Sequence, residues 1–139
     1  MAGYMTKLQG YIYEGELENG AGKAVENGTL MIANASKLVL PSADAETKLL
    51  CKEVTTIDGN VAAYRFVVEA LAKNYYMVEN GHDVNDGAEY DTATYAVAAG
   101  KLLRAHPLVV GEEFVTSKVT GTPAAGTVYG VKADGTIGA

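Results

Sequence analysis

The sequence feature that most constrains the fold is a set of six Asn-Gly or Asp-Gly pairs spread over 139 residues. The pairs are Asn19-Gly20, Asn27-Gly28, Asp58-Gly59, Asn80-Gly81, Asp86-Gly87 and Asp134-Gly135. Asn or Asp followed by Gly is the dipeptide that best tolerates the positive φ angles of tight hairpin turns. Turns at this density favour a β-rich chain of short antiparallel strands.

The segments between the turns show the period of two that an extended strand requires. Two sets of side chains alternate in residues 49–57, and Asp58-Gly59 is placed to turn the chain into residues 61–72 as a hairpin. The other predicted strands are residues 11–18, 29–32, 37–40, 75–78, 92–98, 101–105, 113–119 and 127–132. Short strands without long helices between them predict a mainly β or β-rich α+β fold, a small antiparallel barrel or sandwich with at most one or two short helices.

Two segments are compatible with a helix. Residues 61–73 also place apolar side chains on one helical face, but residues 64–68 are aromatic and β-branched and favour a strand. Residues 42–46 resemble a capped helical turn, because Ser42 and Asp44 stand near its start. We therefore expect a strand in the first segment and a short helical turn in the second.

The length of the chain predicts one domain, since 139 residues can bury a modest core but not two full ones. We expect residues 1–26 to form an N-terminal arm or edge strand and residues 27–139 to form a single β-rich domain. The single cysteine, Cys51, cannot form an internal disulfide and is predicted to be a small buried thiol.

The charge of the chain bears on its partners. Eleven Lys and Arg against seventeen Asp and Glu leave a net charge of −6, which disfavours a nucleic-acid backbone or an anionic membrane as the main partner. The longest uncharged stretch, residues 119–131, contains Pro123 and is well short of the ~20 apolar residues that a membrane helix needs. The expected partner is another protein.

Catalytic motifs are poorly supported, and we predict no catalytic residue. Cys51 could be combined with His82 or His106 and with Asp83 in a nucleophilic triad, but no local signature supports one. Glutamate groups at residues 14–18 and 112–113 could suggest acid–base pairs, yet neither has the apolar surroundings that separate two carboxylate pKa values. Solvated surface glutamates are the favoured interpretation, and a hydrolase remains the rival hypothesis.

Metal-binding candidates are His82 and Asp83, which lie beside Asp86 in one acidic loop, and His106, which could join them from elsewhere. Residues 79–91 hold five acids and no Lys or Arg. The spacing is not a known ligand signature, so a solvated loop and a surface histidine are favoured. A symmetric oligomer could still assemble one histidine per subunit around its axis. No cofactor is expected.

The tyrosines give a better functional signal, because nine tyrosines against two phenylalanines suggest rings whose hydroxyls stay in water. Tyr4, Tyr11 and Tyr13 lie in an N-terminal region without a strong apolar pattern of its own. We predict that these three contact a partner. The alternative, a first strand packed on its own domain, is equally open.

One segment is similar to a known family. Residues 100–117 read GKLLRAHPLVVGEEFVTS, with Tyr95 before them and Val128 and Asp134-Gly135 after them. This pattern of strands and turns resembles the small capsid decoration, or cement, proteins of tailed bacteriophages. The resemblance extends over residues 75–139, with weaker support from residues 27–32.

The resemblance implies a structural role without chemistry. Such a protein binds the major capsid protein on the outside of the virion and bridges neighbouring capsomers, as a monomer or as a homo-oligomer such as a trimer. It is made in the cytoplasm of the host bacterium. Other readings of the same pattern are a tail-tube or other head protein, or a β-barrel binding module of a cell-surface or secretion system.

Overall fold

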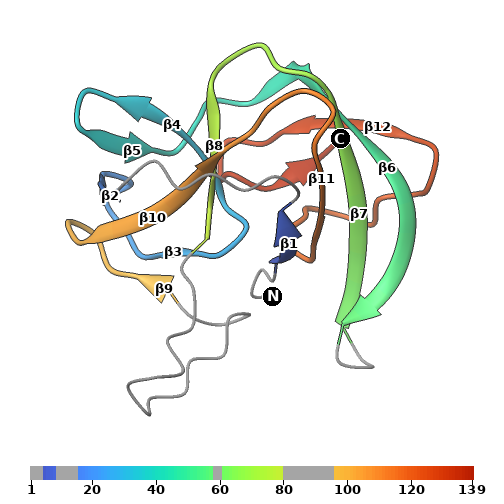
Figure 1. The fold of residues 1–139 in the computed structure, drawn as a ribbon, viewed down its shortest axis with the longest axis horizontal. Helices are drawn as coiled ribbons and strands as arrows, with labels where there is room; N and C mark the ends of the chain where they lie inside the picture. Colours follow the sequence, from blue (N-terminus) through green and yellow to red (C-terminus); the bar gives the residue numbers. More distant parts are fainter. Residues whose placement is uncertain (1–4, 9–15, 58–60, 80–95) are drawn as a thin grey trace.

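The computed structural model describes residues 5–8, 16–57, 61–79 and 96–139, and all regular elements in these ranges are strands (Figure 1). A closed barrel is formed by β2 (Glu16–Asn19), β4 (Leu30–Asn34), β5 (Lys37–Val39), β8 (Tyr75–Val78) and β10 (Leu102–Pro107). A six-stranded sheet is formed by β1 (Met5–Leu8), β6 (Asp44–Ile57), β7 (Val61–Ala70), β11 (Glu113–Thr116), β12 (Val128–Val131) and β13 (Ile137–Gly138). The predicted mainly β class is confirmed.

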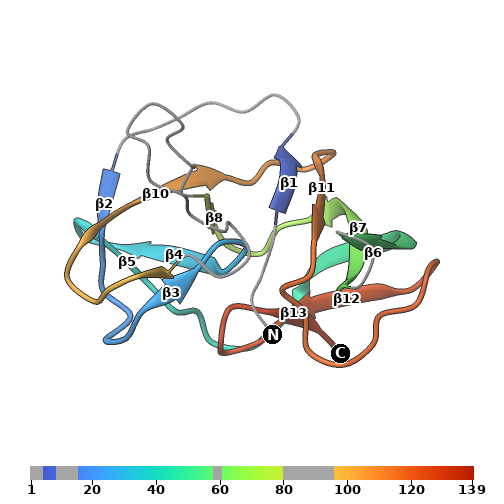
Figure 2. The ribbon, with the colours of Figure 1, turned by 90° about the horizontal axis from the view of Figure 1, so that it is seen from below.

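The barrel and the sheet lie side by side, with the barrel on the left of Figure 2 and the sheet on the right. The barrel order is β10-β2-β5-β4-β8, and the sheet order is β1-β11-β7-β6-β12-β13. All the pairings between strands are antiparallel except that of β2 with β5. A small ribbon of β3 (Val25–Glu26) and β9 (Ala96–Val97) packs against the barrel. Residues 1–26 thus supply β1 at one edge of the sheet, β2 within the barrel and β3.

The hairpin of β6 and β7 is the largest element of the sheet. Its register runs from Lys48 opposite Ala70 to Ile57 opposite Val61. The ambiguous segment of residues 61–73 is therefore a strand as far as Ala70, as the aromatic and β-branched content predicts. Leu49 and Phe66 on one face of the hairpin are completely buried.

The predicted helical turn at residues 42–46 is wrong, because β6 already begins at Asp44. The carboxylate of Asp44 does accept the backbone N–H groups of Glu46 and Thr47, as a helix-capping aspartate would. However, Thr47, Leu49 and Cys51 are fully buried at a period of two, which only an extended chain can satisfy. Burial therefore overrides the local capping signal.

The molecule has two hydrophobic cores, because some strands bury side chains on both of their faces. In β4, Leu30 packs into the main core between barrel and sheet, whereas the next residue, Met31, fills the barrel interior. The main core comprises Leu30, Leu49, Cys51, Tyr64, Phe66, Val68, Tyr75, Met77, Leu108, Phe114, Val131 and Ile137. The barrel core comprises Val25, Met31, Leu38, Val78, Val97, Leu103 and Ala105. Barrel and sheet therefore share the main core, whereas the barrel core is separate.

The Asx-Gly pairs serve more than one purpose. Gly28 and Gly135 have positive φ angles of 88° and 82°, as the turn prediction requires. Gly20 has no positive φ, and a side chain there would place a Cβ 3.1 Å from the carbonyl oxygen of Leu38. Close packing, and not turn geometry, requires that glycine. The remaining three pairs lie outside the described residues.

Candidate functional site

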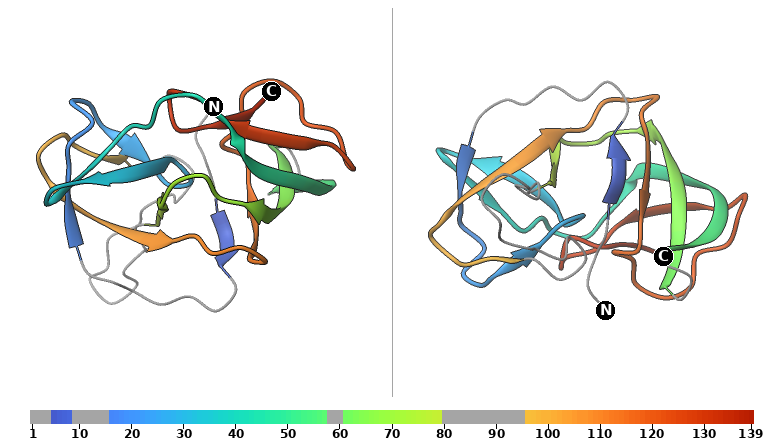
Figure 3. Two further views of the ribbon diagram at one scale, coloured as in Figure 1. Left: turned by 90° about the horizontal axis from the view of Figure 1, so that it is seen from above. Right: turned by 60° about the horizontal axis from the view of Figure 1, so that its bottom comes forward.

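The connection between barrel and sheet is the most distinctive surface feature. β10 pairs with β2 and β8 and then leads through a tight turn into β11 of the sheet (Figure 3). We call residues 108–112 the docking turn. The N–H of Glu112 donates to the carbonyl of Val109 at 3.2 Å, and Gly111 between them has a φ of 95°. A positive φ at the third position is the mark of a type II turn, which requires glycine there.

The docking turn exposes two adjacent apolar side chains. Val109 and Val110 have exposed fractions of 57% and 61%. The other large apolar side chains that are exposed in the described residues are isolated ones: Val54, Leu102 and Val128. Single exposed apolar residues are ordinary on protein surfaces, whereas an adjacent pair at the tip of a turn offers a continuous contact.

The backbone of the docking turn is held by both halves of the molecule. The N–H of Leu108 donates to the carbonyl of Tyr75 in the barrel at 2.9 Å. The N–H of Gly111 donates to the carbonyl of Val68 in the sheet at 2.8 Å, and the N–H of Val68 donates to the carbonyl of Glu112 at 2.9 Å. The side chain of Leu108 is buried in the main core. The exposed valines therefore sit on a fixed support.

A buried contact between a histidine and a glutamate adjoins the docking turn. Nε2 of His106 contacts Oε2 of Glu112, and both side chains are almost completely enclosed. The other carboxylate oxygen of Glu112, Oε1, accepts the N–H of Val109 at 3.0 Å. The carboxylate of Glu112 thus links the barrel strand β10 to Val109 in the docking turn.

Glu79 belongs to the same cluster. It follows β8, and its N–H donates to the carbonyl of Arg104 on β10 at 3.0 Å. Its Oε1 is buried and has no hydrogen-bond partner among the described residues. Burial raises the pKa of Glu79, the charge on Glu112 raises it further, and His106 acts in the opposite direction. At Glu79 burial therefore outweighs the effect of His106.

A second buried cluster is centred on Asp44. Its Oδ2 accepts the hydroxyls of Tyr75 at 2.7 Å and Thr47 at 2.9 Å, and Thr47 Oγ1 accepts the N–H of Ala72 at 2.9 Å. Burial alone would raise the pKa of Asp44, but the hydrogen bonds from Tyr75, Thr47 and the backbone outweigh it and lower the pKa. Burial and the bond to Asp44 raise the pKa of Tyr75. This cluster ties β6 of the sheet to β8 of the barrel.

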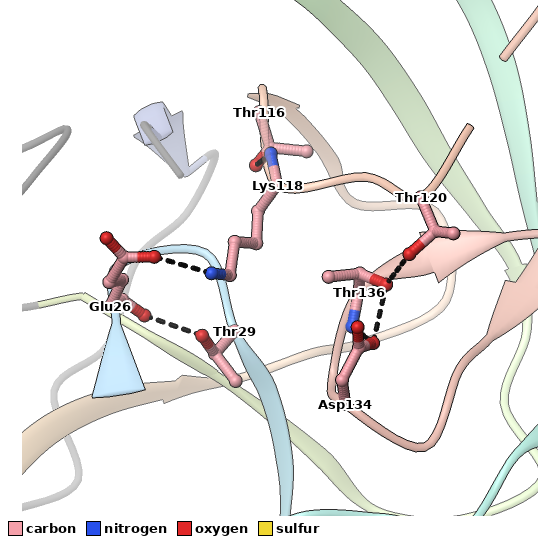
Figure 4. Close-up of polar contacts among 7 residues, drawn as sticks. All are labelled: Glu26, Thr29, Thr116, Lys118, Thr120, Asp134 and Thr136. Carbon is pink, nitrogen blue, oxygen red and sulfur yellow. Dashed lines mark hydrogen bonds and ion pairs between the residues drawn. The ribbon is translucent and has the colours of Figure 1, made fainter. Parts of the chain in front are cut away.

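A groove of about 380 Å³ lies where the β3 region meets the C-terminal part of the chain (Figure 4). Nζ of Lys118 donates to Oε1 of Glu26 at 2.6 Å across it. Asp134 accepts the N–H of Thr136 at 3.0 Å and its hydroxyl at 2.6 Å. Burial alone would raise the pKa of Asp134, but these bonds and the charge of Lys118 lower it. Lys118 and Glu26 thus form an ion pair across the groove, and the carboxylate of Asp134 is bonded within its own turn.

The residues predicted to contact a partner, Tyr4, Tyr11 and Tyr13, lie outside the described residues. The metal candidates His82 and Asp83 lie outside them as well. Among the residues that are described, no group of three or more His, Cys, Asp and Glu side chains is arranged to hold a metal ion. These site predictions therefore stay predictions.

Two surface assignments from the sequence are wrong. His106 is only 2% exposed and not a surface histidine: by alternation it shares a face of β10 with the exposed Leu102 and Arg104, but at its own position that face is covered and it contacts the enclosed side chain of Glu112. Glu112 was expected to be a solvated surface glutamate with Glu113, but it is 5% exposed, whereas Glu113 is exposed and pairs with Arg65 at 3.8 Å. A glutamate beside a glycine turn gives no sequence signal of burial.

The buried thiol predicted for Cys51 is confirmed, since its side chain is completely enclosed and burial raises its pKa. Val109 and Val110 were not predicted to be surface residues. The signal in the sequence is the apolar run Leu108-Val109-Val110 directly before Gly111, of which only Leu108 is buried.

The described part of the chain has no helix that is both long and apolar enough to cross a membrane. No protein-family model matches the chain, and neither a curated protein nor a solved structure matches it.

Proposed function

We propose that the chain is a non-enzymatic structural virion protein that decorates and stabilises the outside of a phage capsid by binding the major capsid protein. One observation carries the proposal. Residues 100–117, the segment that resembles capsid decoration proteins, fold into β10, β11 and the docking turn, on which Val109 and Val110 are exposed. The part of the chain with the resemblance is therefore also the part with a fixed apolar contact surface.

The energetics of such a contact are favourable. Full burial of a valine side chain contributes about 1.5–3 kcal/mol. Val109 and Val110 each keep more than half of their side-chain surface exposed. Burying this exposed surface on a partner contributes on the order of 2 kcal/mol to the binding free energy, or about 30-fold in affinity. A ligand that binds only the assembled shell stabilises the shell over free subunits, and the effect grows with the number of copies bound.

The charge of the chain supports an external position. A net charge of −6 repels the phosphates of packaged DNA, which lie against the inner face of a capsid. An acidic protein with a shared, enclosed core and an exposed apolar turn is suited to bind from outside. Contact surfaces, and not a reactive side chain, then perform the function.

The experiment is a binding assay on capsids assembled without this protein. Purified chain is mixed with expanded capsids and sedimented, and the pelleted particles are imaged by cryo-electron microscopy. We expect saturable co-sedimentation, additional density on the outer surface and a higher melting temperature of the shell. Unassembled capsid protein is the control and should bind more weakly. Absence of the chain from the pellet and of the external density would overturn the proposal.

A further inference from the structure

We propose that Asn19-Gly20 is a latent deamidation site, which the folded barrel keeps closed and which loses its side-chain nitrogen as ammonia when Gly20 separates from β5. The inference concerns a reaction of the chain with itself and does not rest on the proposed function. Asparagine is one of the thermally labile residues of proteins, and a following glycine has no side chain to hinder attack by its backbone nitrogen.

The reaction needs only these two residues, a base and water. The backbone nitrogen of Gly20 gives its proton to the base and attacks Cγ of Asn19, which closes a five-membered succinimide ring. The bond from Cγ to Nδ2 breaks, and the nitrogen takes up a proton and leaves as ammonia. Water then opens the ring at either carbonyl, so the product is an aspartate or an isoaspartate, whose main chain runs through the side-chain carbon.

The fold engages the attacking nitrogen. The N–H of Gly20 donates to the carbonyl of Leu38 on β5 at 2.7 Å. A Cβ on Gly20 would lie 3.1 Å from that carbonyl oxygen, so the two backbones approach each other closely. The nitrogen can lose its proton to a base only after the bond to β5 has broken. Separation of Gly20 from β5 is therefore the opening step.

The carboxamide of Asn19 is held as well, and Asn19 is only 1% exposed. Its Nδ2 donates to the carbonyls of Lys23 at 2.9 Å and Val97 at 3.0 Å, and its Oδ1 accepts the N–H of Ala21 at 2.9 Å. Both bonds of Nδ2 must break before ammonia can leave. The same bonds anchor the end of β2 to β9, which gives the asparagine a structural purpose in spite of its lability.

Asn27-Gly28 provides an internal reference. Asn27 is 3% exposed, and the N–H of Gly28 donates to the carbonyl of Val78 at the end of β8 at 2.9 Å. Its glycine nitrogen is therefore also engaged by a barrel strand, but by β8 instead of β5. A change that loosens β5 alone should affect the reaction at Asn19 more than the reaction at Asn27.

The products do not fit the closed barrel. In an aspartate, the oxygen that replaces Nδ2 is an acceptor that faces the carbonyls of Lys23 and Val97, so two hydrogen bonds become repulsions. An isoaspartate adds an atom to the main chain, for which the close approach of Gly20 to β5 leaves little room. Val97 lies in the barrel core, so loss of this anchor loosens the core. A chain that opens and deamidates therefore cannot close as before.

The first test compares the chain in buffer with the chain unfolded in urea, both at mildly alkaline pH in oxygen-18 water. Mass spectrometry of peptides measures the gain in mass at residue 19, and ring opening by the labelled water identifies the succinimide route. We expect deamidation at Asn19 to be about tenfold slower, or slower still, in the folded chain. Equal rates would show that the fold does not close the site, and an absence of product in urea would show that there is no site.

The second test locates the opening step. Leu38→Val loosens β5 in the barrel core, and Leu49→Val makes the same change at a leucine that is equally buried in the main core. Melting temperatures should show both variants to be folded. We expect Leu38→Val to accelerate deamidation at Asn19 severalfold in buffer, with a smaller effect at Asn27, and Leu49→Val to leave the rate at Asn19 nearly unchanged. Equal acceleration by both variants would overturn local opening at β5.

The third test examines the product. Burial and the two facing carbonyls should raise the pKa of the carboxyl in Asn19→Asp, so its protonated form is favoured in acid and can donate a hydrogen bond again. Urea unfolding should therefore show a loss of stability that grows from acid to neutral pH. Asn19→Ala, which loses the same donors without adding a charge, should show a loss that does not change with pH. If Asn19→Asp is as stable as the unaltered chain at neutral pH, the product fits the fold and the inference is overturned.

Discussion

Two buried carboxylate clusters join the barrel to the sheet, and they differ in how completely their charges are satisfied. Asp44 accepts hydrogen bonds from two hydroxyls and two backbone N–H groups, so burial is outweighed and its pKa is lowered. Glu79 has a buried oxygen without a hydrogen-bond partner in the described residues, so burial dominates and its pKa is raised. The sign of the effect is decided by the number of donors and not by burial itself.

The difference matches the positions of the clusters in the fold. The Asp44 cluster lies where β6 and β8 must stay together, and a completely bonded carboxylate stabilises that contact at neutral pH. The Glu79 cluster lies beneath the docking turn, where Glu112 is divided between His106 and the backbone of Val109. The buried oxygen of Glu79 that lacks a donor in the described part of the chain costs stability. The bonds of Glu112 hold the exposed turn in place. The two clusters therefore differ in their contribution to stability at neutral pH.

The largest effect is expected for Asp44→Ala. The change leaves the hydroxyls of Tyr75 and Thr47 without their acceptor, so we expect the free energy of unfolding at pH 7 to fall by about 2–3 kcal/mol. Urea unfolding of both proteins measures it. Because the pKa of Asp44 is lower in the folded state, its contribution is full above the usual value of 3.8 and is lost as the pH falls through the lowered pKa.

The two unfolding curves for Asp44→Ala should therefore converge in acid. A constant difference between pH 7 and pH 3 would show that the side chain acts by packing alone. Asp134→Ala is the control, because that carboxylate also has a lowered pKa but is bonded by Thr136 and not by Tyr75 or Thr47 (Figure 4).

A smaller effect is expected for Tyr75→Phe, which removes a single donor from Asp44 and keeps the buried ring. One hydrogen bond to a charged group contributes about 1.5–3 kcal/mol, and Thr47 continues to bond the same oxygen, so a loss of about 1.5 kcal/mol is expected. The pKa of Asp44 should rise toward its usual value, which NMR titration of the carboxyl carbon can follow. An unchanged pKa would contradict the assignment of Tyr75 as a principal donor.

The fold could be predicted from the sequence because its signals are local. Tyr75–Val78 forms a strand with the predicted bounds, and the hairpin of residues 49–57 with the next segment follows from alternation and an Asp-Gly turn. The strands β1, β3 and β13 span two to four residues, which is too short for a period of two to be recognised. The prediction of a helical turn at residues 42–46 was wrong because an aspartate that bonds nearby backbone N–H groups is not confined to helix starts. It can also lie in a strand, where its oxygens accept bonds from side chains far away in the sequence.

The candidate site could not be predicted in the same way. His106 and Glu112 are six residues apart, and only the turn between β10 and β11 brings them together. Glu79 joins them through strand pairing, which the sequence does not specify at the level of single side chains. Exposure of Val109 and Val110 likewise depends on what the neighbouring strands can cover. Tertiary arrangement, and not composition, determines these features.

The smallest effect, and one of opposite sign, is expected for Glu79→Gln. Glutamine keeps the shape of the side chain and removes a charge that burial disfavours, so the free energy of unfolding at pH 7 should rise by a few tenths to about 1 kcal/mol. The pKa of Glu79 is raised in the folded state, so its contribution is full below the usual value of 4.5 and is lost as the pH rises through the raised pKa.

The unaltered chain and Glu79→Gln should therefore be equally stable near pH 4 and diverge toward neutral pH, the reverse of the behaviour expected for Asp44→Ala. Urea unfolding at several pH values measures both variants. Loss of stability in Glu79→Gln at pH 7 would mean that the carboxylate has donors beyond those of the described residues, and the two clusters would then be alike. A gain that grows with pH establishes that the charge of the partly buried Glu79 opposes folding, whereas the charge of Asp44 supports it.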